Sequence, residues 1–422
     1  MMKKIFLRLL LFLPLCMISK GASAYDIEVP NADGVTIYYN YINDGTELEV
    51  TNGLNKYWGT INIPEEVTVG GHTLKVTSIE RAFSGCWGVT SVMIPNGVTT
   101  IVDGAFSGSG ITSITIPNSI TTIGSFAFGD CSNLASVWIG DGVTSIGKQA
   151  FRFCHQLASV TIGNSVTSIG DFAFQGCKLT SVIIPNSVTT IGEYAFEECL
   201  DLASAVIGDG VVTIGDYAFK QCQSLTFLSI GSVLGNINES VFDECFHLSQ
   251  VELTSDEIVS QNYSEETSLG KLFGNRVNDY IIGEGVTTIG DYAFNGCSKL
   301  DISSTVSKIG KRLFSKRATV DVTCRATTIP ETDEETFTTF NLQRSTLHVP
   351  EASLEAYRTT APWSGFYNIV AITPTGINSP MVKQLPVLAE YFDLNGRRTS
   401  QPQRGVNIVK MNDGTTKKIV VK

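Results

Sequence analysis

The sequence has little of what most enzymes and metal sites require. It contains four histidines among 422 residues, His72, His155, His247 and His348, and none recurs in a pattern or lies near a nucleophile motif. The ten cysteines lack the Cys-x-x-Cys spacing with nearby histidine that is typical of zinc ligands. No paired acid–base set and no phosphate-binding glycine motif is present. We therefore expect a protein that is not an enzyme and that holds no metal ion or cofactor.

Basic charge is also scarce. The chain has 30 Lys and Arg against 41 Asp and Glu, a formal net charge of −11. Four basic residues and no acidic ones lie in residues 1–24, so the remainder has 26 basic residues and a net charge of −15. A chain this acidic lacks the basic patch that binds nucleic acid or an anionic membrane surface, so we expect neither as a partner.

Long apolar runs are absent after the first residues of the chain. Lys3 and Lys4 form a basic start, residues 5–18 are apolar, and Ala22 to Ala24 end the segment with small residues. This order is typical of a secretory signal peptide. The run is shorter than the ~20 residues of a membrane-spanning helix. We expect residues 1–24 to be a signal peptide and the mature protein to be exported, without a transmembrane segment.

A regular repeat dominates the rest of the chain. Its units follow the pattern L-x-x-V-x-I-(P/G)-x-x-V-T-x-I-G-x-x-A-F-x-x-C, and their phenylalanines lie 22 or 23 residues apart: Phe83, Phe106, Phe128, Phe151, Phe174, Phe196, Phe219 and Phe242. Further copies at Phe294 and Phe314 follow an interruption over 246–280, where LGKLF (Leu269 to Phe273) is interpreted as a degenerate coil. A period this short predicts a solenoid, because each unit buries its apolar face only against its neighbours. We expect about ten units over residues 67–330.

Each unit predicts two short strands. In V-x-I the apolar residues alternate, as in a strand with one face inward. The Pro or Gly that follows ends this strand, since Pro has no amide hydrogen for the ladder. The V-T-x-I segment predicts a second short strand with a bend, and A-F-x-x-C is too short for more than one helical turn.

The pattern resembles the BspA-like class of leucine-rich repeats, found in bacterial surface proteins. The segments LASVTIGNSVTSIGDFAFQGC and LTSVIIPNSVTTIGEYAFEEC match that class almost position for position. The resemblance implies a repeat solenoid of short parallel β-strands and short helical turns. It also implies a cell-surface or secreted location, with a role in adhesion.

One glycine column tests whether the repeat contains a special backbone conformation. Its members are Gly124, Gly147, Gly170, Gly192, Gly215 and Gly290, but Glu80 and Val102 fill the same position in the first two units. A β-branched residue at positive φ would be a steric outlier. We therefore expect these glycines to serve close backbone packing. The acidic residue that follows the glycine, as at Asp171, is expected to cap the helical turn.

The cysteines also form a column: Cys86, Cys131, Cys154, Cys177, Cys199, Cys222, Cys245 and Cys297, with Ser109 in the same slot of one unit. Stacked coils point these side chains the same way, whereas a disulfide needs two that face each other. We expect a buried ladder of free thiols that behave as small hydrophobes.

The outward positions of the strands are the best candidate for a binding site. The predicted partner-binding strip consists of Met93, Thr115, Trp138, Thr161, Ile183, Val206 and Phe227, beside a column that is mostly serine. An exposed apolar row with a tryptophan is typical of a contact surface. The alternative is that these residues only suit β-strands.

The two ends of the array differ from the repeat. Residues 25–66 predict a β cap with a hairpin around Asn43-Asp44-Gly45. Residues 331–372 predict a C-terminal cap with a helical middle and closing aromatics Trp363, Phe366 and Tyr367, and 373–386 predict a linker.

The last segment, residues 387–422, predicts a small β module with two turn signals. It resembles the C-terminal modules that some exported proteins of anaerobic Gram-negative bacteria use for sorting, although it is shorter. The alternative is a purely structural module.

Three functions fit these features. The first is adhesion, in which the strand face binds a host or bacterial surface protein, including proteins of the extracellular matrix. The second is a surface scaffold or spacer without its own ligand. The third is a glycan-binding module in which Trp138 stacks on a sugar.

Overall fold

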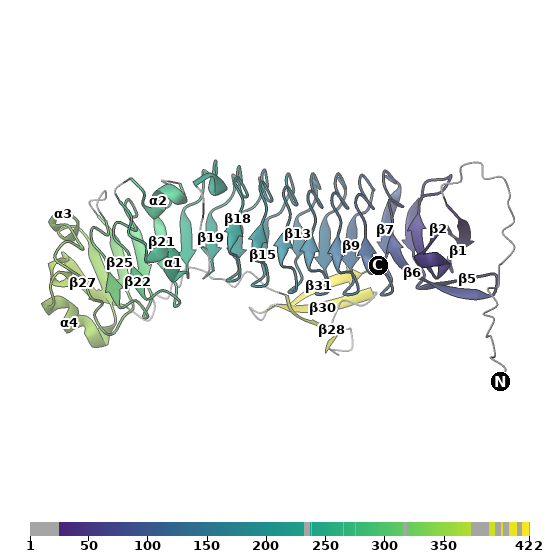
Figure 1. Ribbon diagram of the computed structural model, residues 1–422. Coiled ribbons are helices and arrows are strands. Elements are labelled where there is room, and N and C mark those ends of the chain that lie inside the picture. Colours follow the sequence, from purple (N-terminus) through teal and green to yellow (C-terminus); the bar gives the residue numbers. More distant parts are fainter. Residues whose placement is uncertain are drawn as a thin grey trace, which may run out of the picture.

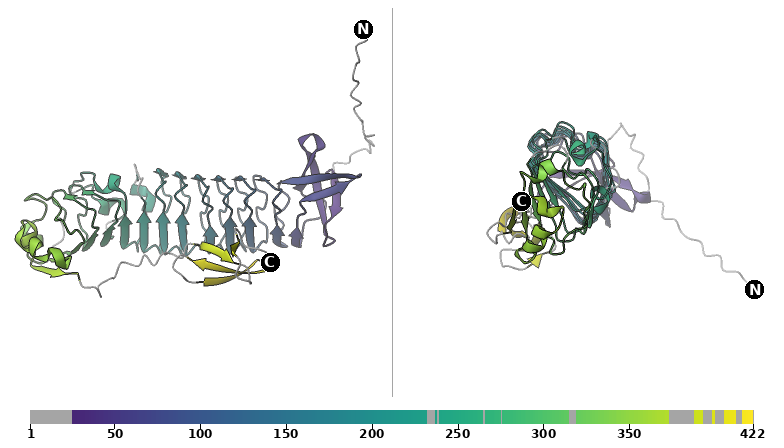
Figure 2. Two further views of the ribbon diagram at one scale, coloured as in Figure 1. Left: turned by 90° about the horizontal axis from the view of Figure 1, so that it is seen from below. Right: turned by 90° about the vertical axis from the view of Figure 1, so that its left-hand side faces the viewer.

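The computed structural model describes residues 25–231, 237, 239–264, 266–274, 276–314 and 319–372, and the backbone of four strands between residues 388 and 421. The chain forms an elongated solenoid in which successive coils lie one behind another (Figures 1 and 2). Parallel strands and few helices make up each coil, as the repeat predicts. The fold class inferred from the sequence is confirmed. The predicted signal peptide and the predicted linker lie outside the described residues.

The V-x-I segments form the longer strands of the coils, which pair in parallel with their neighbours. They are β4 (Gly59–Asn62), β7 (Val89–Met93), β9 (Ser113–Ile116), β11 (Ser136–Ile139), β13 (Ser159–Thr161), β15 (Ser181–Ile184), β17 (Ser204–Ile207), β19 (Phe227–Ile230), β20 (Gln250–Leu253), β21 (Asp279–Ile282), β23 (Lys299–Ile302), β25 (Asp321–Cys324), β26 (Thr346–Val349) and β27 (Asn368–Ala371). Their outward side is called the strand face below. The last two of these strands lie in the range predicted as the C-terminal cap.

The second predicted strand of each unit is present as two residues on another side of the coil. These strands are β8 (Thr100–Ile101), β10 (Thr122–Ile123), β12 (Ser145–Ile146), β14 (Ser168–Ile169), β16 (Thr190–Ile191), β18 (Thr213–Ile214), β22 (Thr288–Ile289) and β24 (Lys308–Ile309). They also pair in parallel from coil to coil.

The N-terminal strands continue this second sheet. They are β1 (Ile27–Pro30), β2 (Thr36–Ile42), β3 (Glu47–Thr51), β5 (Glu66–Val69) and β6 (His72–Ile79), with the short helix η1 (Asn43–Gly45) between β2 and β3. The predicted hairpin is present as the antiparallel pair β2–β3. Strand β3 then pairs in parallel with β6, and β6 with β8, so the backbone hydrogen bonds of the array begin in the N-terminal segment.

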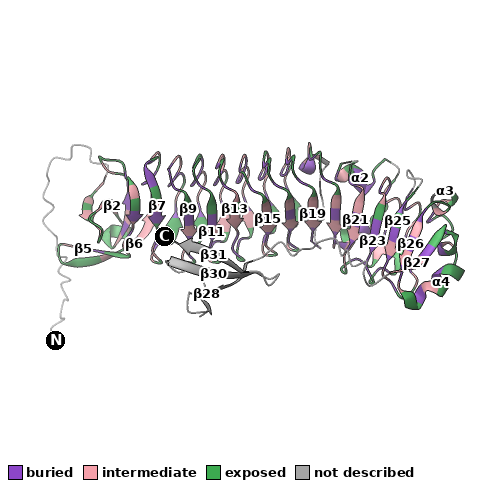
Figure 3. Cartoon of the chain, turned by 180° about the vertical axis from the view of Figure 1, so that it is seen from behind, coloured by how far each residue is buried: buried purple, intermediate pink, exposed green. Residues whose placement is uncertain are grey.

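The core is a stack of phenylalanine rings that runs along the solenoid. The Phe106 and Phe128 ring centroids lie 4.8 Å apart, and those of Phe151 and Phe174 lie 5.2 Å apart, with nearly parallel planes. On the N-terminal side Tyr57 lies 5.0 Å from Phe83 and Tyr38 lies 5.7 Å from Tyr57, so tilted tyrosine rings extend the stack into the N-terminal segment. Figure 3 shows the same alternation of buried and exposed positions in one coil after another. The core therefore grows by one ring per coil, as expected for a repeat whose units stabilise their neighbours.

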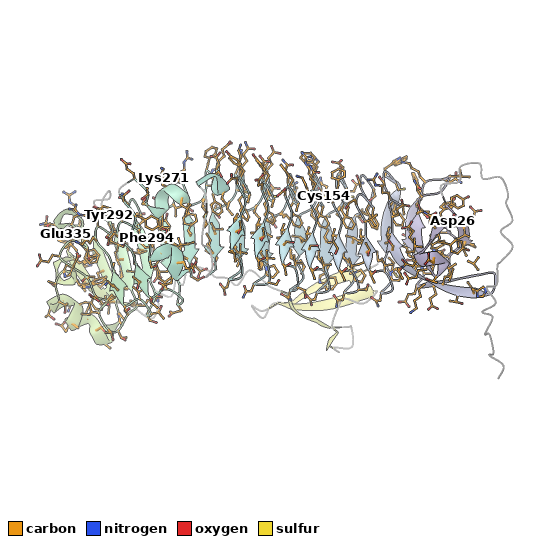
Figure 4. All side chains as sticks on the ribbon, viewed as in Figure 1. Asp26, Cys154, Lys271, Tyr292, Phe294 and Glu335 are labelled. Carbon is orange, nitrogen blue, oxygen red and sulfur yellow. The ribbon has the colours of Figure 1, made fainter. Side chains whose placement is uncertain are left out.

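The cysteine column is buried beside this stack, and all nine described cysteines are free. Six of these thiols donate to the carbonyl oxygen of the phenylalanine in the preceding coil. Cys131 Sγ lies 3.1 Å from Phe106 O and Cys177 Sγ 3.1 Å from Phe151 O. Cys154 marks this column in the middle coils of Figure 4. The predicted thiol ladder is present, and the sulfur–carbonyl bonds are an addition to it.

The glycine column packs closely on the coil before it. A Cβ atom at Gly147 would lie 2.7 Å from the carbonyl carbon of Gly124, and one at Gly170 would lie 2.8 Å from that of Gly147. None of these glycines has a positive φ. The prediction that they serve close packing is confirmed.

The residue two positions after each column glycine has a left-handed backbone conformation, and this residue is often aromatic. Phe126, Phe172, Tyr194, Tyr217 and Tyr292 have φ between 55° and 60°. Half-buried rings at this position stack from coil to coil, with 4.8 Å between the centroids of Phe172 and Tyr194. Ring stacking offsets part of the steric cost of this conformation.

The acidic residues after the glycine do not cap helices. Their neighbouring segments are turns, and the carboxylates instead accept hydrogen bonds from the next coil. Asp171 Oδ1 lies 3.1 Å from Glu193 N, and Asp291 Oδ1 lies 2.7 Å from Lys311 N. The prediction of a helix cap was wrong, because the tight turn leaves no helical amides at that site and brings the following coil within reach.

Short helices gather where the repeat is irregular. They are η2 (Glu239–Phe242), α1 (Asp256–Val259), α2 (Leu269–Leu272), α3 (Thr339–Leu342), η3 (Glu351–Ser353), α4 (Leu354–Thr359) and η4 (Trp363–Gly365). The predicted degenerate coil is present, because Phe273 packs 5.7 Å from Phe242 and continues the ring stack.

In the C-terminal cap, Trp363 and Phe366 are buried as closing aromatics. Tyr367 is 80% exposed, so its assignment to this core was wrong. Beyond the cap, strands β28 (Leu388–Phe392), β29 (Arg398–Thr399), β30 (Gly405–Met411) and β31 (Thr416–Val421) form an antiparallel sheet. This sheet is the predicted small β module.

Candidate functional site: the strand face

Parallel pairing aligns most of the predicted strip into one row across the strand face. Trp138 lies opposite Thr115 on one side and Thr161 on the other. Ile183 lies opposite Val206 in the next group of paired strands. Within each group, parallel pairing places residues of equal repeat position side by side. Strands β13 and β15, at the junction of the two groups, are in contact but are not paired.

Met93 and Phe227 occupy the two ends of the predicted strip differently. Met93 ends β7, which lies beside β9, and its side chain is 37% exposed. Phe227 pairs with Ser204 and Gln250, so it belongs to the neighbouring serine row, two residues earlier in the strand. The place of Phe227 in the row is therefore taken by Ser229, which pairs with Val206.

The outward side chains of the strip are half-buried between their neighbours. Thr115, Trp138, Thr161, Ile183 and Val206 all have intermediate exposure, whereas the residues between them in sequence point into the core. In β11, for example, Val137 and Ile139 are buried on either side of Trp138. The strip thus presents a ridge of side-chain ends, whose spacing is fixed by the parallel pairing within each group of strands.

The same row becomes charged towards the C-terminal end. Beyond Ser229 it continues through Glu252, Ile281, Asp301, Thr323 and His348. Asp301 is 8% exposed and accepts two hydrogen bonds from Arg325, at 2.8 Å from Nε and 2.7 Å from Nη2. The strand face therefore has an apolar half and a charged half, and the predicted strip covers only the apolar half.

Further charged groups flank this half of the row. His348 Nε2 lies 2.9 Å from Asp321 Oδ1, in the adjacent strand. Burial raises the pKa of Asp279, and the nearby Lys299 opposes that rise. An alignment of the late units would have predicted this cluster of charged residues. These units depart from the repeat pattern, however, so their strand positions are not evident from the sequence.

Two further histidines contact backbone carbonyl groups. His155 Nδ1 lies 3.1 Å from Gly176 O, and His247 Nδ1 lies 2.6 Å from Gln223 O, each in a neighbouring coil. Among the described residues no three His, Cys, Asp or Glu side chains gather as a metal site would require. Within the same residues no helix has the length and apolar character to cross a membrane.

A solenoid of parallel strands that repeats every 22 or 23 residues defines a leucine-rich repeat protein. The family model described as BspA type leucine rich repeat region matches residues 73–177, 144–270 and 271–361, with six copies. The chain belongs to this family, as the repeat pattern indicated. Proteins with this solenoid generally act as binding scaffolds rather than as catalysts.

Several solved structures are similar to this chain at low sequence identity. A leucine rich cell surface protein from Faecalibacterium prausnitzii is 22% identical, with a TM-score of 0.42, over 82% of this chain and 95% of that one. A leucine-rich repeat protein from Bacteroides ovatus is 22% identical, with a TM-score of 0.32, over 83% and 100% of the two chains. The pneumococcal vaccine antigen PcpA is 16% identical, with a TM-score of 0.35, over 83% and 99%. A comparison with curated protein sequences finds no match.

Proposed function

We propose that the protein is exported to the cell surface and binds a surface protein of a host or of another cell through its strand face. The contact surface is the apolar half of the face, with Met93, Trp138, Ile183 and Val206 as its anchors and Thr115 and Thr161 between them. The observation that carries this proposal is the parallel register, which assembles residues from separate units into one row.

The physical argument is one of preorganisation. A partner that docks on this row meets side chains already held at strand spacing, about 4.8 Å apart, so it pays little ordering entropy. Trp and Met are enriched in the cores of protein interfaces, and the flanking serine row supplies hydroxyl groups for a polar rim. The acidic balance of the array disfavours acidic partners and favours neutral or basic ones.

The test replaces the four anchors together: Met93→Thr, Trp138→Thr, Ile183→Thr and Val206→Thr. Threonine keeps the β-propensity of the strands but removes the apolar side-chain ends. Binding to immobilised fibronectin and collagen and to whole epithelial cells is measured for the wild type and for this strip variant. The matched control replaces four exposed apolar residues off the strand face: Leu200→Thr, Val212→Thr, Phe246→Thr and Tyr367→Thr.

The proposal predicts that the strip variant loses binding by about tenfold or more, which corresponds to ~1.4 kcal/mol, while the control variant keeps it. Equal binding by both variants would eliminate the strip as the contact surface. Absence of binding by the wild type to every probe would instead favour the scaffold or spacer function.

Export and sorting need their own experiment. Residues 1–24 are proposed to direct export, and the module at 387–422 is proposed to direct sorting to the surface. A variant that lacks 387–422 should still leave the cytoplasm but should no longer be digested by protease added to intact cells. Unchanged surface exposure of this variant would mean that the module has a purely structural role.

A further inference from the structure

Two tryptophans lie side by side and exposed near the N-terminal end of the solenoid. Trp58 is 65% exposed and Trp87 is 69% exposed, and their ring centroids lie 4.8 Å apart with an interplanar angle of 81°. Trp58 directly precedes β4, and Trp87 lies two residues before the start of β7. The two strands pair in parallel, and Gly59 N donates to Gly88 O at 2.8 Å. The backbone ladder of the array therefore brings together two residues from different segments.

The Trp58 ring rests on the backbone of the next coil. A Cβ atom at Gly88 would lie 2.0 Å from Cε3 of Trp58, so a glycine is required at residue 88 for the ring to occupy this place. Gly88 is buried, although Trp58 is not. The ring is thus held in one position while most of its surface stays in contact with water.

The coil that follows leaves Trp87 uncovered. Trp87 comes directly after the cysteine column, and the residue at this position in the next coil is Gly110. A Cβ atom at Gly110 would lie 1.9 Å from the carbonyl oxygen of Trp87, so no larger residue fits there. Within the described residues, Trp58 is the one ring in contact with Trp87. The two indoles therefore form a corner in which the rings contact each other and the rest of their surface is largely exposed.

Neither tryptophan has a role in the core. Tyr57 makes the core contact of this segment, through Phe83, and it is 4% exposed. Of the other two tryptophans, Trp363 is buried and Trp138 is half-buried. Leaving two adjacent indoles in water costs free energy unless they meet a ligand, and such exposed aromatic pairs mark contact sites.

We propose that Trp58 and Trp87 form a binding site for a neutral glycan. The negative face of an indole ring attracts the polarised C–H bonds on the apolar face of a pyranose ring. Two indoles at nearly right angles offer one face to stack on and one edge to orient the sugar. This site is separate from the strand-face strip, and it does not depend on the function proposed for that strip.

The surroundings favour a sugar over a protein partner. A stable protein interface buries about 800 Å² on each side. The exposed residues that flank the pair in sequence are mainly polar, with Asn55, Ser84 and Thr90 among them and Leu54 as the apolar exception. Exposed hydroxyl and amide side chains close in sequence to the two tryptophans suit the alternating C–H and O–H groups of a carbohydrate.

The available charges favour a neutral ligand. Lys56 is the nearest basic residue in sequence, and its Nζ already donates to Gly85 O at 2.8 Å. Glu80 is likewise occupied, because its carboxylate accepts a hydrogen bond from Thr51 at 2.6 Å. A carboxylated or sulfated sugar would need a cation held against the indoles, whereas Lys56 Nζ is directed at the backbone of Gly85.

The experiment titrates the chain from Tyr25 onwards with cellohexaose, laminarihexaose, chitohexaose and maltohexaose and follows tryptophan fluorescence and binding heat. We expect at least one of these neutral oligosaccharides to bind. Trp87→Ala should lower its affinity about tenfold or more, since stacking on one aromatic anchor contributes this much. The thermal unfolding midpoint of Trp87→Ala should stay close to that of the wild type, because the side chain is exposed.

Two controls separate this site from others. Phe246→Ala removes an exposed ring at the same repeat position as Trp87, and it should leave the affinity unchanged. The four-residue strip variant should also bind the oligosaccharide normally. Failure of all four oligosaccharides to bind the wild type, or equal affinity of wild type and Trp87→Ala, would overturn the proposal. Loss of cell or matrix-protein binding in Trp87→Ala without any oligosaccharide binding would overturn it too, in favour of a protein partner.

Discussion

The thiol of Cys154 donates a hydrogen bond to the carbonyl oxygen of Phe128, one coil earlier in the solenoid, over a distance of 3.2 Å. Five other coils repeat this bond, so that each cysteine is tied to the backbone beside the preceding core ring. Each of these carbonyl oxygens also accepts a backbone N–H from its own turn, so the thiol adds a second hydrogen bond that links one coil to the next. In one unit Ser109 replaces cysteine and lies 3.4 Å from Cys131 Sγ.

We expect Cys154→Ala to destabilise the protein by about 1–2 kcal/mol, because it removes the hydrogen bond and leaves a small void. Cys154→Ser keeps a donor of smaller size and should cost less. Urea unfolding followed by circular dichroism measures both variants. If Cys154→Ala proves as stable as Cys154→Ser, the hydrogen bond to Phe128 contributes nothing to stability, and the column requires only a small side chain.

The buried thiols predict a loss of stability in alkali. Burial raises the pKa of Cys131 and Cys199 to about 12. A thiol in the unfolded chain has a pKa of about 8.5. The neutral form is favoured in the folded protein, so this contribution is complete below pH ~8.5 and is lost as the pH rises towards 12.

At about pH 10.5 each such thiol should lower the free energy of unfolding by about 2 kcal/mol relative to pH 8. Burial also raises the pKa of Tyr39, which adds to the effect in the same direction. Urea titrations at pH 8 and 10.5 test this, with Cys199→Ala as the control, which should lose less stability on going to the higher pH. Equal stability at the two pH values would contradict the burial of the column.

Gly147→Ala tests the close packing of successive coils. The new methyl group would lie 2.7 Å from the backbone of Gly124, which cannot move without disturbing the sheet. We expect a destabilisation of about 1–3 kcal/mol, typical of overpacking. The matched control is Gly270→Ala, at a glycine in the helix α2. Its Cβ would lie 3.3 Å from the nearest atom, so this variant should change the unfolding midpoint little. Similar midpoints for both variants would mean that the glycine column has another cause.

The pair Asp301–Arg325 predicts strong coupling between two charged residues. The side chain of Asp301 is 12% exposed and that of Arg325 34% exposed. Removing either partner leaves a half-buried charge, so Arg325→Met and Asp301→Asn should each cost about 2–3 kcal/mol. The double variant should be more stable than the sum of the two changes predicts, as measured by a double-mutant cycle of urea unfolding. Additive effects would show that the two charges do not stabilise each other.

The repeat pattern was sufficient to predict the solenoid because its residues act in columns. Once Phe128 and Phe151 are aligned, parallel pairing forces Val137 and Val160 into the core and Trp138 and Thr161 outward. The buried cysteine column and the close packing of Gly147 follow from the same alignment. Each of these inferences uses only residue spacing, which the sequence contains directly.

Residue spacing alone could not predict the features that depend on the geometry of the turns. The left-handed backbone at Phe172 and Tyr194 has no composition signal, because both residues normally avoid it. The bond between Asp171 and the amide of Glu193 depends on how tightly the coils stack. Trp58 was missed because it lies outside the recognisable repeat, so alignment alone does not place it beside Trp87.

Because each coil adds one ring to the core, the number of coils can change without changing the segments at the two ends of the solenoid. Adding or removing a whole unit would insert or delete one strand spacing, about 4.8 Å, and would leave every other coil in the same local surroundings. The Trp58–Trp87 corner would then move relative to the charged end of the strand face, around Asp301 and Arg325, in steps of fixed size. Variants of this chain with whole units added or removed would therefore hold these two end surfaces at different separations that change in equal steps.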